Sequence, residues 1–125
     1  MKRRRKPDDR YQVGRTGEVI ACLYLREKGW EIVETNWRTR TGELDVIARC
    51  GSQLVIVEVR TTRSTRFGYG LESVDARKQQ QVRKLGLQYV HARGWHHLPI
   101  RFDVISILLT DGNQPARIDH VEGAF

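Results

Sequence analysis

Residues 42–60 constrain the fold most strongly, because they hold two apolar runs on either side of a short polar break. "GELDVIA" and "QLVIVEVR" have the apolar, β-branched composition of strands, and residues 49–52 between them are typical of a turn. This pattern predicts a β-hairpin. Carboxylates interrupt both runs, at Glu43, Asp45 and Glu58. A carboxylate in a core-facing strand is costly to desolvate unless a cation lies beside it, so these acids are candidate functional residues.

The acids of the two predicted strands can share one face of the hairpin. Side chains alternate along a strand, so Glu43 and Asp45 point the same way, and Glu58 and Arg60 also agree. A turn with an even number of residues brings all four groups to one face. An odd turn separates the two pairs, because a slip of one residue reverses every side chain.

With an even turn, the expected register pairs Ala48 with Gln53. It sets Glu43 opposite Glu58 and Asp45 opposite Ile56. Like charges facing each other across two strands repel. Either each acid pairs with one of the many arginines, or a divalent cation lies between the acids. For the whole cluster we favour the cation, because Mg²⁺ takes hard oxygen ligands such as carboxylates.

A helix is expected before the hairpin, beginning at Thr16 or earlier and ending at Gly29. Glu18 lies at the edge of its apolar side. It is either a functional residue or a first-turn glutamate that complements the helix dipole. The apolar side is made by six consecutive residues, namely Ile20, Ala21, Cys22, Leu23, Tyr24 and Leu25.

The remaining elements complete a single α/β domain. Residues 30–37 alternate as a strand, and residues 61–73 form a long polar loop. Ser73 can cap a helix that runs to about Ala92. A core strand follows Pro99, and residues 116–123 predict a short edge strand. The order is α-β-β-β-α-β, with a central mixed sheet flanked by helices.

The chain has 125 residues and a formal net charge of +7, which favours a polyanionic partner, nucleic acid before membrane. Residues 1–10 are a basic tail, expected to be disordered when free, and residues 11–125 form the domain. Cys22 and Cys50 lack zinc-ligand spacing and are two free thiols or a single bridge. No run is long and apolar enough to span a bilayer, so we expect a cytoplasmic protein with no membrane partner.

Several motifs together resemble a known family. "GRTGE", "NWR", "GELDVIA", "VIVEVR" and "RFDVISI" are similar to the YraN-like family of bacterial proteins, over nearly the whole chain from about Gly14 to Leu109. The spaced acids on a hairpin, after a helix that carries a glutamate, also resemble the restriction-endonuclease-like core of the PD-(D/E)xK nucleases. Glu43 belongs to the GE-x-D motif of the YraN-like family. The resemblance implies a nuclease-like fold and putatively nucleolytic chemistry.

The resemblance also implies roles for individual residues. Asp45 and Glu58 would bind Mg²⁺ or Mn²⁺, with the Val59 carbonyl as a further oxygen ligand. Glu18 would bind a second metal ion or its water. Arg60 stands where the nuclease motif has lysine. Arginine stays protonated and cannot be a general base, but it can hold the scissile phosphate bidentately.

Lys78 offers a second route for an amine to reach the acids. It is the one charged residue on a helical stripe with Val74, Val82, Leu85 and Tyr89. Either it snorkels at the edge of that stripe, or its amine reaches over the sheet to the carboxylates.

Basic residues flank the acidic cluster on both sides. Arg38 and Arg40 precede the second strand of the hairpin, while Arg63 and Arg66 follow the other. With Lys78 they are candidate nucleic-acid contacts.

The sequence therefore predicts a Mg²⁺-dependent endonuclease that hydrolyses DNA phosphodiester bonds. Analogy with related nucleases suggests branched or repair structures. The alternative is a nucleic-acid-binding or assembly module of the same fold that cleaves nothing, and it is favoured by Arg60 in the lysine position.

Overall fold

A computed structural model describes residues 9–63 and 74–125. The elements are, in chain order, α1 (Asp9–Glu27), β1 (Glu31–Thr39), β2 (Gly42–Cys50), β3 (Gln53–Thr62), α2 (Ala76–Arg93), β4 (Ile100–Leu109) and β5 (Pro115–Val121). The expected order is confirmed, and β5 is the edge strand expected near the C-terminus. Helix α1 begins at Asp9, so it includes the last two residues of the basic segment 1–10, Asp9 and Arg10.

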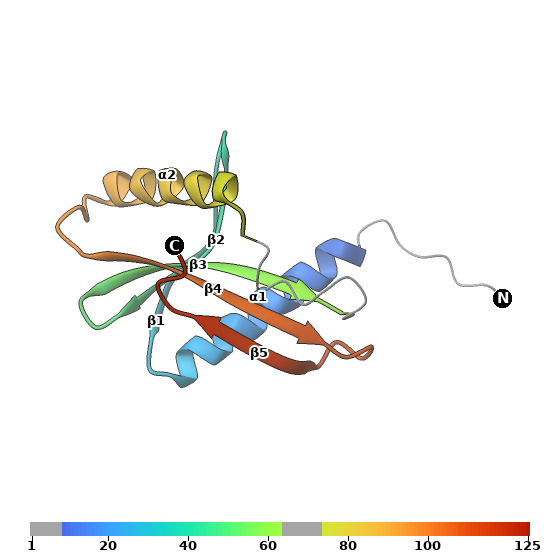
Figure 1. Cartoon of the computed structure of the whole chain (residues 1–125). Coiled ribbons are helices and arrows are strands. Elements are labelled where there is room, and N and C mark those ends of the chain that lie inside the picture. Colours follow the sequence, from blue (N-terminus) through green and yellow to red (C-terminus); the bar gives the residue numbers. More distant parts are fainter. Residues whose placement is uncertain (1–8, 64–73) are drawn as a thin grey trace.

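The five strands form one mixed sheet in the order β1-β2-β3-β4-β5 (Figure 1). Neighbouring strands are antiparallel except β3 and β4, which run parallel. Parallel strands need a long crossover connection, and α2 lies in that connection. The sheet is therefore covered by α1 on one face and by α2 on the other (Figure 1).

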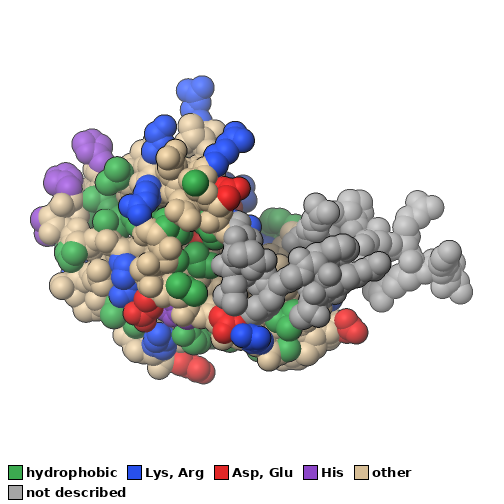
Figure 2. Space-filling view, viewed as in Figure 1, with side chains coloured by type: hydrophobic (Ala, Val, Ile, Leu, Met, Phe, Trp, Pro, Cys, Tyr) green, Lys and Arg blue, Asp and Glu red, His purple; other side chains and the backbone are tan. Residues whose placement is uncertain are grey.

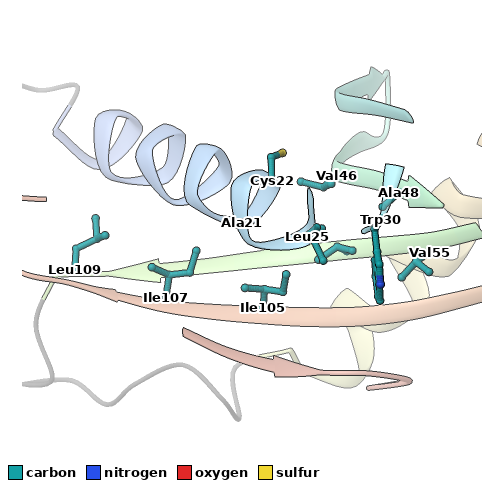
Figure 3. Close-up of a cluster of buried hydrophobic side chains, with 11 residues drawn as sticks. Ala21, Cys22, Leu25, Trp30, Val46, Ala48, Val55, Ile105, Ile107 and Leu109 are labelled. Carbon is teal, nitrogen blue, oxygen red and sulfur yellow. The ribbon is translucent and has the colours of Figure 1, made fainter. Parts of the chain in front are cut away.

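Each helix closes a separate apolar core against its face of the sheet. On the α1 face, Ala21, Leu25 and Trp30 pack on β-branched residues of the central strands (Figure 3). On the α2 face, Leu85 and Tyr89 pack against the opposite side chains of the same strands. The central strands are thus apolar on both faces, which explains why their sequence reads as nearly continuous hydrophobic runs.

The buried side of α1 is narrower than the sequence predicted. Ala21 and Leu25 are fully buried, but Leu23 is 54% exposed. A helix turns by about 100° per residue, so Leu23 lies almost opposite Ala21. The helix ends as expected, because Gly29 adopts the left-handed conformation, with φ of 87°.

The N-cap of α2 is Asp75, not the predicted Ser73. The Asp75 side chain accepts the backbone N–H of Lys78 at 2.9 Å. Ser73 itself lies outside the described residues. The cap matters for function because it fixes the first turn of α2, and therefore the direction in which the side chain of Lys78 leaves the helix.

A buried polar network joins β4, β5 and α1. Asp103, which is fully buried, accepts hydrogen bonds from Arg101 and from the backbone N–H of Gly123, and it contacts His120 Nε2 at 2.7 Å. The Tyr24 hydroxyl lies 3.1 Å from His120 Nδ1. Burial raises the pKa of Asp103, but these hydrogen bonds outweigh it and lower the pKa to about 2. His120, which falls in the predicted edge strand, is a residue of β5 whose side chain is only 4% exposed.

Two glycines in α1 provide a matched test of how closely this helix approaches the sheet. A Cβ at Gly17 would overlap the hydroxyl of Thr61 in β3 and lie 2.8 Å from its Cβ, whereas a Cβ at Gly14 meets nothing within 4 Å. Gly17→Ala should destabilise the fold by about 1–3 kcal/mol through overpacking. Gly14→Ala should stabilise it by about 0.5–1 kcal/mol through helix propensity. Urea denaturation followed by circular dichroism measures both, and equal stabilities would disprove the close approach.

Candidate active site

The turn between β2 and β3 sets the position of the acids. Only residues 51–52 separate the strands, so the turn is even and the acids share a face, as expected. The expected register, however, is wrong by two residues, because Ala48 lies opposite Val55 and not Gln53. Because the turn has two residues and not the expected four, each residue of β3 lies opposite a residue of β2 that is two places from the expected one.

The pairing between β2 and β3 ends at the acids. Its last pair joins Val46 and Val57, and Asp45 and Glu58 are the next residue on each strand. Asp45, and not Glu43, is therefore level with Glu58. Because β2 continues to pair with β1 as far as its first residue, the β1–β2 hairpin separates from β3 at this point (Figure 1).

Asp45 and Glu58 meet in the gap that this separation leaves. Asp45 Oδ2 accepts a hydrogen bond of 2.9 Å from the N–H of Val59, and its carboxyl is also hydrogen-bonded to Glu58. Burial is the largest cause of the raised pKa of Asp45. The charge of Glu58 and the hydrogen bond with Glu58 raise this pKa further, to about 8, whereas the hydrogen bond from the Val59 N–H lowers it. Asp45 therefore keeps its proton at neutral pH, as one member of a pair of closely spaced acids does.

Lys78 reaches this carboxyl pair from α2. Its Nζ lies 3.3 Å from Oε2 of Glu58, whose side chain is 7% exposed. Of the two alternatives left open by the sequence, the amine therefore contacts the acids. Lys78 belongs to the first turn of α2, which Asp75 caps. The site thus combines the buried carboxyl of Glu58, the partly buried carboxyl of Asp45 and one ammonium group.

Glu18 approaches the same region from α1. Its carboxyl hydrogen-bonds to Asn36 and lies 3.6 Å from Arg15. Burial is the largest cause of its raised pKa, and the charges of Glu43 and Glu58 contribute in the same direction. The charges of the other acids therefore raise the pKa of Glu18, but its direct contacts are with Asn36 and Arg15.

Asn36 is a site residue that the sequence analysis missed. It adopts a positive φ of 54° inside β1, a conformation that asparagine tolerates better than most residues. Its neighbours Thr35 and Trp37 pair with Val46 and Leu44, which places Asn36 opposite Asp45. The sequence signal was an asparagine within an otherwise regular strand pattern.

The predicted nucleic-acid contacts are arranged less uniformly. Arg38 forms an ion pair of 2.7 Å with Glu43. Glu43 therefore follows the alternative in which an acid pairs with an arginine, and not the one in which it binds a metal ion. Arg40 is exposed in the β1–β2 turn. Arg63 donates a hydrogen bond to Asn113 at 3.1 Å, next to β5. Arg66 lies outside the described residues.

Arg60 follows Glu58 by two residues on β3, so their side chains leave the strand on the same face. It is partly buried, and it lies opposite Ser106 of β4. This position places a permanent positive charge on the side of the sheet that carries the acids and Lys78.

Among the described residues, two acids meet at this site, Asp45 and Glu58. Within residues 9–63 and 74–125, no three His, Cys, Asp or Glu side chains form a group that could hold a metal ion, so Glu18 does not complete a cluster with Asp45 and Glu58. Mg²⁺ usually takes one or two carboxylates and keeps several waters. A pair that holds a proton when no cation is bound meets that requirement.

The fold and site define a small mixed α/β domain with a carboxyl pair at a break in its sheet. Residues 17–107 match the uncharacterised protein family UPF0102, and the chain belongs to this family. Relatives of the same family name occur in Rhodococcus jostii (44% identity over 113 residues, 90% of this chain and 95% of the relative) and Nocardia farcinica (43% over 117, 94% and 91%). A third, from Pseudomonas aeruginosa, is 43% identical over 115 residues, covering 90% of each chain. The YraN-like resemblance is thus confirmed.

The part of the chain that the structure describes holds no helix that is long and apolar enough to cross a membrane.

The raised pKa of Asp45 makes a prediction about stability. Its pKa is 3.8 in the unfolded chain and about 8 in the folded one, so the folded state binds more protons between these values. The free energy of unfolding should therefore fall as pH rises through this window. Asp45→Asn should remove that part of the fall and stabilise the protein at pH 8.

Urea denaturation in the presence of a chelator, at several pH values between 5 and 8, measures the difference between wild type and Asp45→Asn. Asp111→Asn is the matched control, because Asp111 is exposed in the turn before β5. If the Asp45 and Asp111 variants change equally with pH, Asp45 does not hold a proton in the folded state.

Proposed function

We propose that the protein is a divalent-metal-dependent phosphodiester hydrolase that acts on DNA. The observation that carries this proposal is the Asp45–Glu58 pair with Lys78 beside it. Two acids and an amine at a break in a mixed sheet, close to a glutamate on the preceding helix, agree with the restriction-endonuclease-like arrangement. Membership of the family adds no activity of its own, so the proposal stands on the site.

Asp45 and Glu58 would hold the metal ion in place of the proton that Asp45 keeps. The N–H of Val59 already points at Asp45, and N–H and C=O of one strand residue face the same neighbouring strand, so the Val59 carbonyl can be a further ligand. A bound Mg²⁺ or Mn²⁺ would polarise the phosphate and activate water as the nucleophile. No Ser or Cys nucleophile is then required.

The chain supplies two cations with different abilities. Arg60 stays protonated, so its part is to orient the phosphate and stabilise transition-state charge. Lys78 Nζ lies 3.3 Å from Glu58, so its amine supplies a compact point charge at the acids, whereas Arg60 supplies a planar guanidinium. An arginine in the lysine position weakens the proposal, whereas the amine of Lys78 at the acids supports it. Glu18 would bind a second metal ion or a water molecule from the α1 side.

The second candidate is a DNA-binding module that cleaves nothing. Arg60 in the lysine position is the observation that favours it. In that case the Lys78–Glu58 pair is a structural ion pair at the base of α2. Metal binding and cleavage separate the two candidates.

Metal binding should depend on the carboxyl pair and not on nearby acids. Calorimetric titration with Mg²⁺ or Mn²⁺ at pH 7 should show binding that Glu58→Gln abolishes and Glu43→Gln retains, because Glu43 is already paired with Arg38. Binding should release roughly one proton, since the ligands must be deprotonated and the pair holds one. Buffers of different ionisation enthalpy measure that release. A Glu58→Gln variant that binds metal as wild type does would exclude this site.

Cleavage should respond differently to two substitutions of Arg60. Arg60→Lys should retain or raise activity, whereas Arg60→Ala should lower it roughly a hundredfold, the cost of losing one pre-organised charge. Lys78→Ala should be equally damaging if its amine takes the part of the motif lysine. The assay is a panel of branched, flapped and single-stranded DNA with and without metal, with Asp45→Ala as the inactive control.

If Arg60→Lys is as inactive as Arg60→Ala, the bidentate guanidinium is required and not simply a charge. If no variant cleaves any substrate, but Arg60→Ala weakens DNA binding, the binding module is correct.

A further inference from the structure

Helix α2 carries charge of one sign only. Its 18 residues include five Lys or Arg residues and no Asp or Glu. Figure 2 shows Lys and Arg side chains gathered over this helix, at the top of the view. A surface helix usually mixes both signs, so a helix without acids indicates a polyanionic partner.

Three of the five basic residues have structural partners. Lys78 contacts Glu58, Arg93 pairs with Glu34, and Arg83 lies 5.4 Å from the ring centre of Phe102. These contacts explain their presence without any ligand. The remaining two are Arg77 and Lys84.

Arg77 and Lys84 form no ion pair with any other described residue. They are seven residues apart, which is two helical turns, so both lie on the same side of α2. Neither packs in the α2 core, whose helix residues are Val82, Leu85, Tyr89 and Val90. Because they lie in line about two turns apart, a single polyanion can contact both.

The two charges line a groove between α2 and the tip of the β1–β2 hairpin. Its volume is about 590 Å³, and its lining includes Thr41, Arg77, Lys78, Gln81, Lys84 and Gln88. Within the described part of the chain, the one carboxylate that lines the groove is Asp75, which is engaged as the N-cap. Gln81 donates a hydrogen bond of 2.8 Å to the carbonyl of Thr41, so the hairpin tip is fixed to the helix. The groove is preformed, and most of its polar side chains are donors.

We propose that this α2 groove binds a single strand of nucleic acid next to the carboxyl site. Lys78 belongs to both, because it lines the groove and contacts Glu58, so the groove leads to the acids. The inference rests on the proposed function for its direction, since it assigns the groove to the strand that flanks the scissile phosphate.

The dimensions and chemistry of the groove select a single strand. A space of this volume, closed on one side by the hairpin tip, admits one phosphate backbone but not two paired strands. Lysine and arginine neutralise phosphates, while glutamine amides can bond to phosphate or to base edges. Among the described residues that line the groove none is aromatic, so binding by this part of the chain should depend strongly on salt and weakly on sequence.

The test measures binding without catalysis. Fluorescence anisotropy of the full chain in metal-free buffer compares a short labelled oligothymidine with a blunt duplex of equal length. Lys84→Glu should weaken oligothymidine binding about fivefold or more at about 0.1 M salt, and it should lower the slope of log K against log salt by about 0.7, the value for one phosphate contact on a single strand. Duplex binding should change less.

Arg49→Glu is the matched control, because it makes the same charge change at an exposed position. Arg49 lies near the end of β2, four residues beyond Asp45. If Lys84→Glu and Arg49→Glu weaken binding equally, only net charge matters and the groove is excluded. Equal losses for single strand and duplex would exclude the single-strand assignment.

The binding and cleavage results remain separable. Loss of single-strand binding in Lys84→Glu, together with a wild type that cleaves nothing, would keep the groove and remove the hydrolase. Cleavage that Lys84→Glu leaves unchanged, with unchanged oligothymidine binding, would keep the hydrolase and remove the groove.

Discussion

The arrangement of this molecule depends on two carboxyls, the partly buried Asp45 and the buried Glu58, that meet where two strands separate. Bringing like charges together in a partly buried place is unfavourable unless a proton or a cation lies between them. Both a proton and a cation are present here, because the pair holds a proton and Lys78 adds a positive charge. A sheet selected only for stability would continue the ladder through this position with apolar residues, as it does from Val46 to Ala48.

The two helices bring opposite charges to this break from opposite faces of the sheet. Gly17 lets α1 approach β3 closely, and the next residue is Glu18. Asp75 fixes the first turn of α2, from which Lys78 extends. The apolar cores on the two faces therefore do more than stabilise the sheet, because they hold two independent helices in the positions that assemble the site. Asn36, with its unusual backbone, joins Glu18 to the hairpin.

The sequence predicted the elements and the shared face of the acids, because both follow from periodicity. It did not predict the register, since the apolar pattern of β3 is the same after a shift of two residues and only the length of the turn decides. Leu23 was misassigned because consecutive apolar residues hide which side of a helix is buried. The position of His120 beside Asp103 could not be predicted either, because this pairing depends on β4–β5 packing and has no local pattern.

The positions of Arg60 and Lys78 bear on why an arginine could occupy a lysine position without loss of function. In a motif lysine, one side chain supplies both the positive charge and an exchangeable proton. Here a guanidinium lies on β3 as Arg60, and an amine arrives from α2 as Lys78, in contact with Glu58. Because Arg60 and Lys78 come from two different elements, each of them is also linked to a different part of the molecule. Lys78 lines the α2 groove, so an occupant of the groove lies next to the one amine that touches the carboxyl pair. If the site acts on a phosphodiester as proposed, binding in the groove and chemistry at the acids would be linked through Lys78.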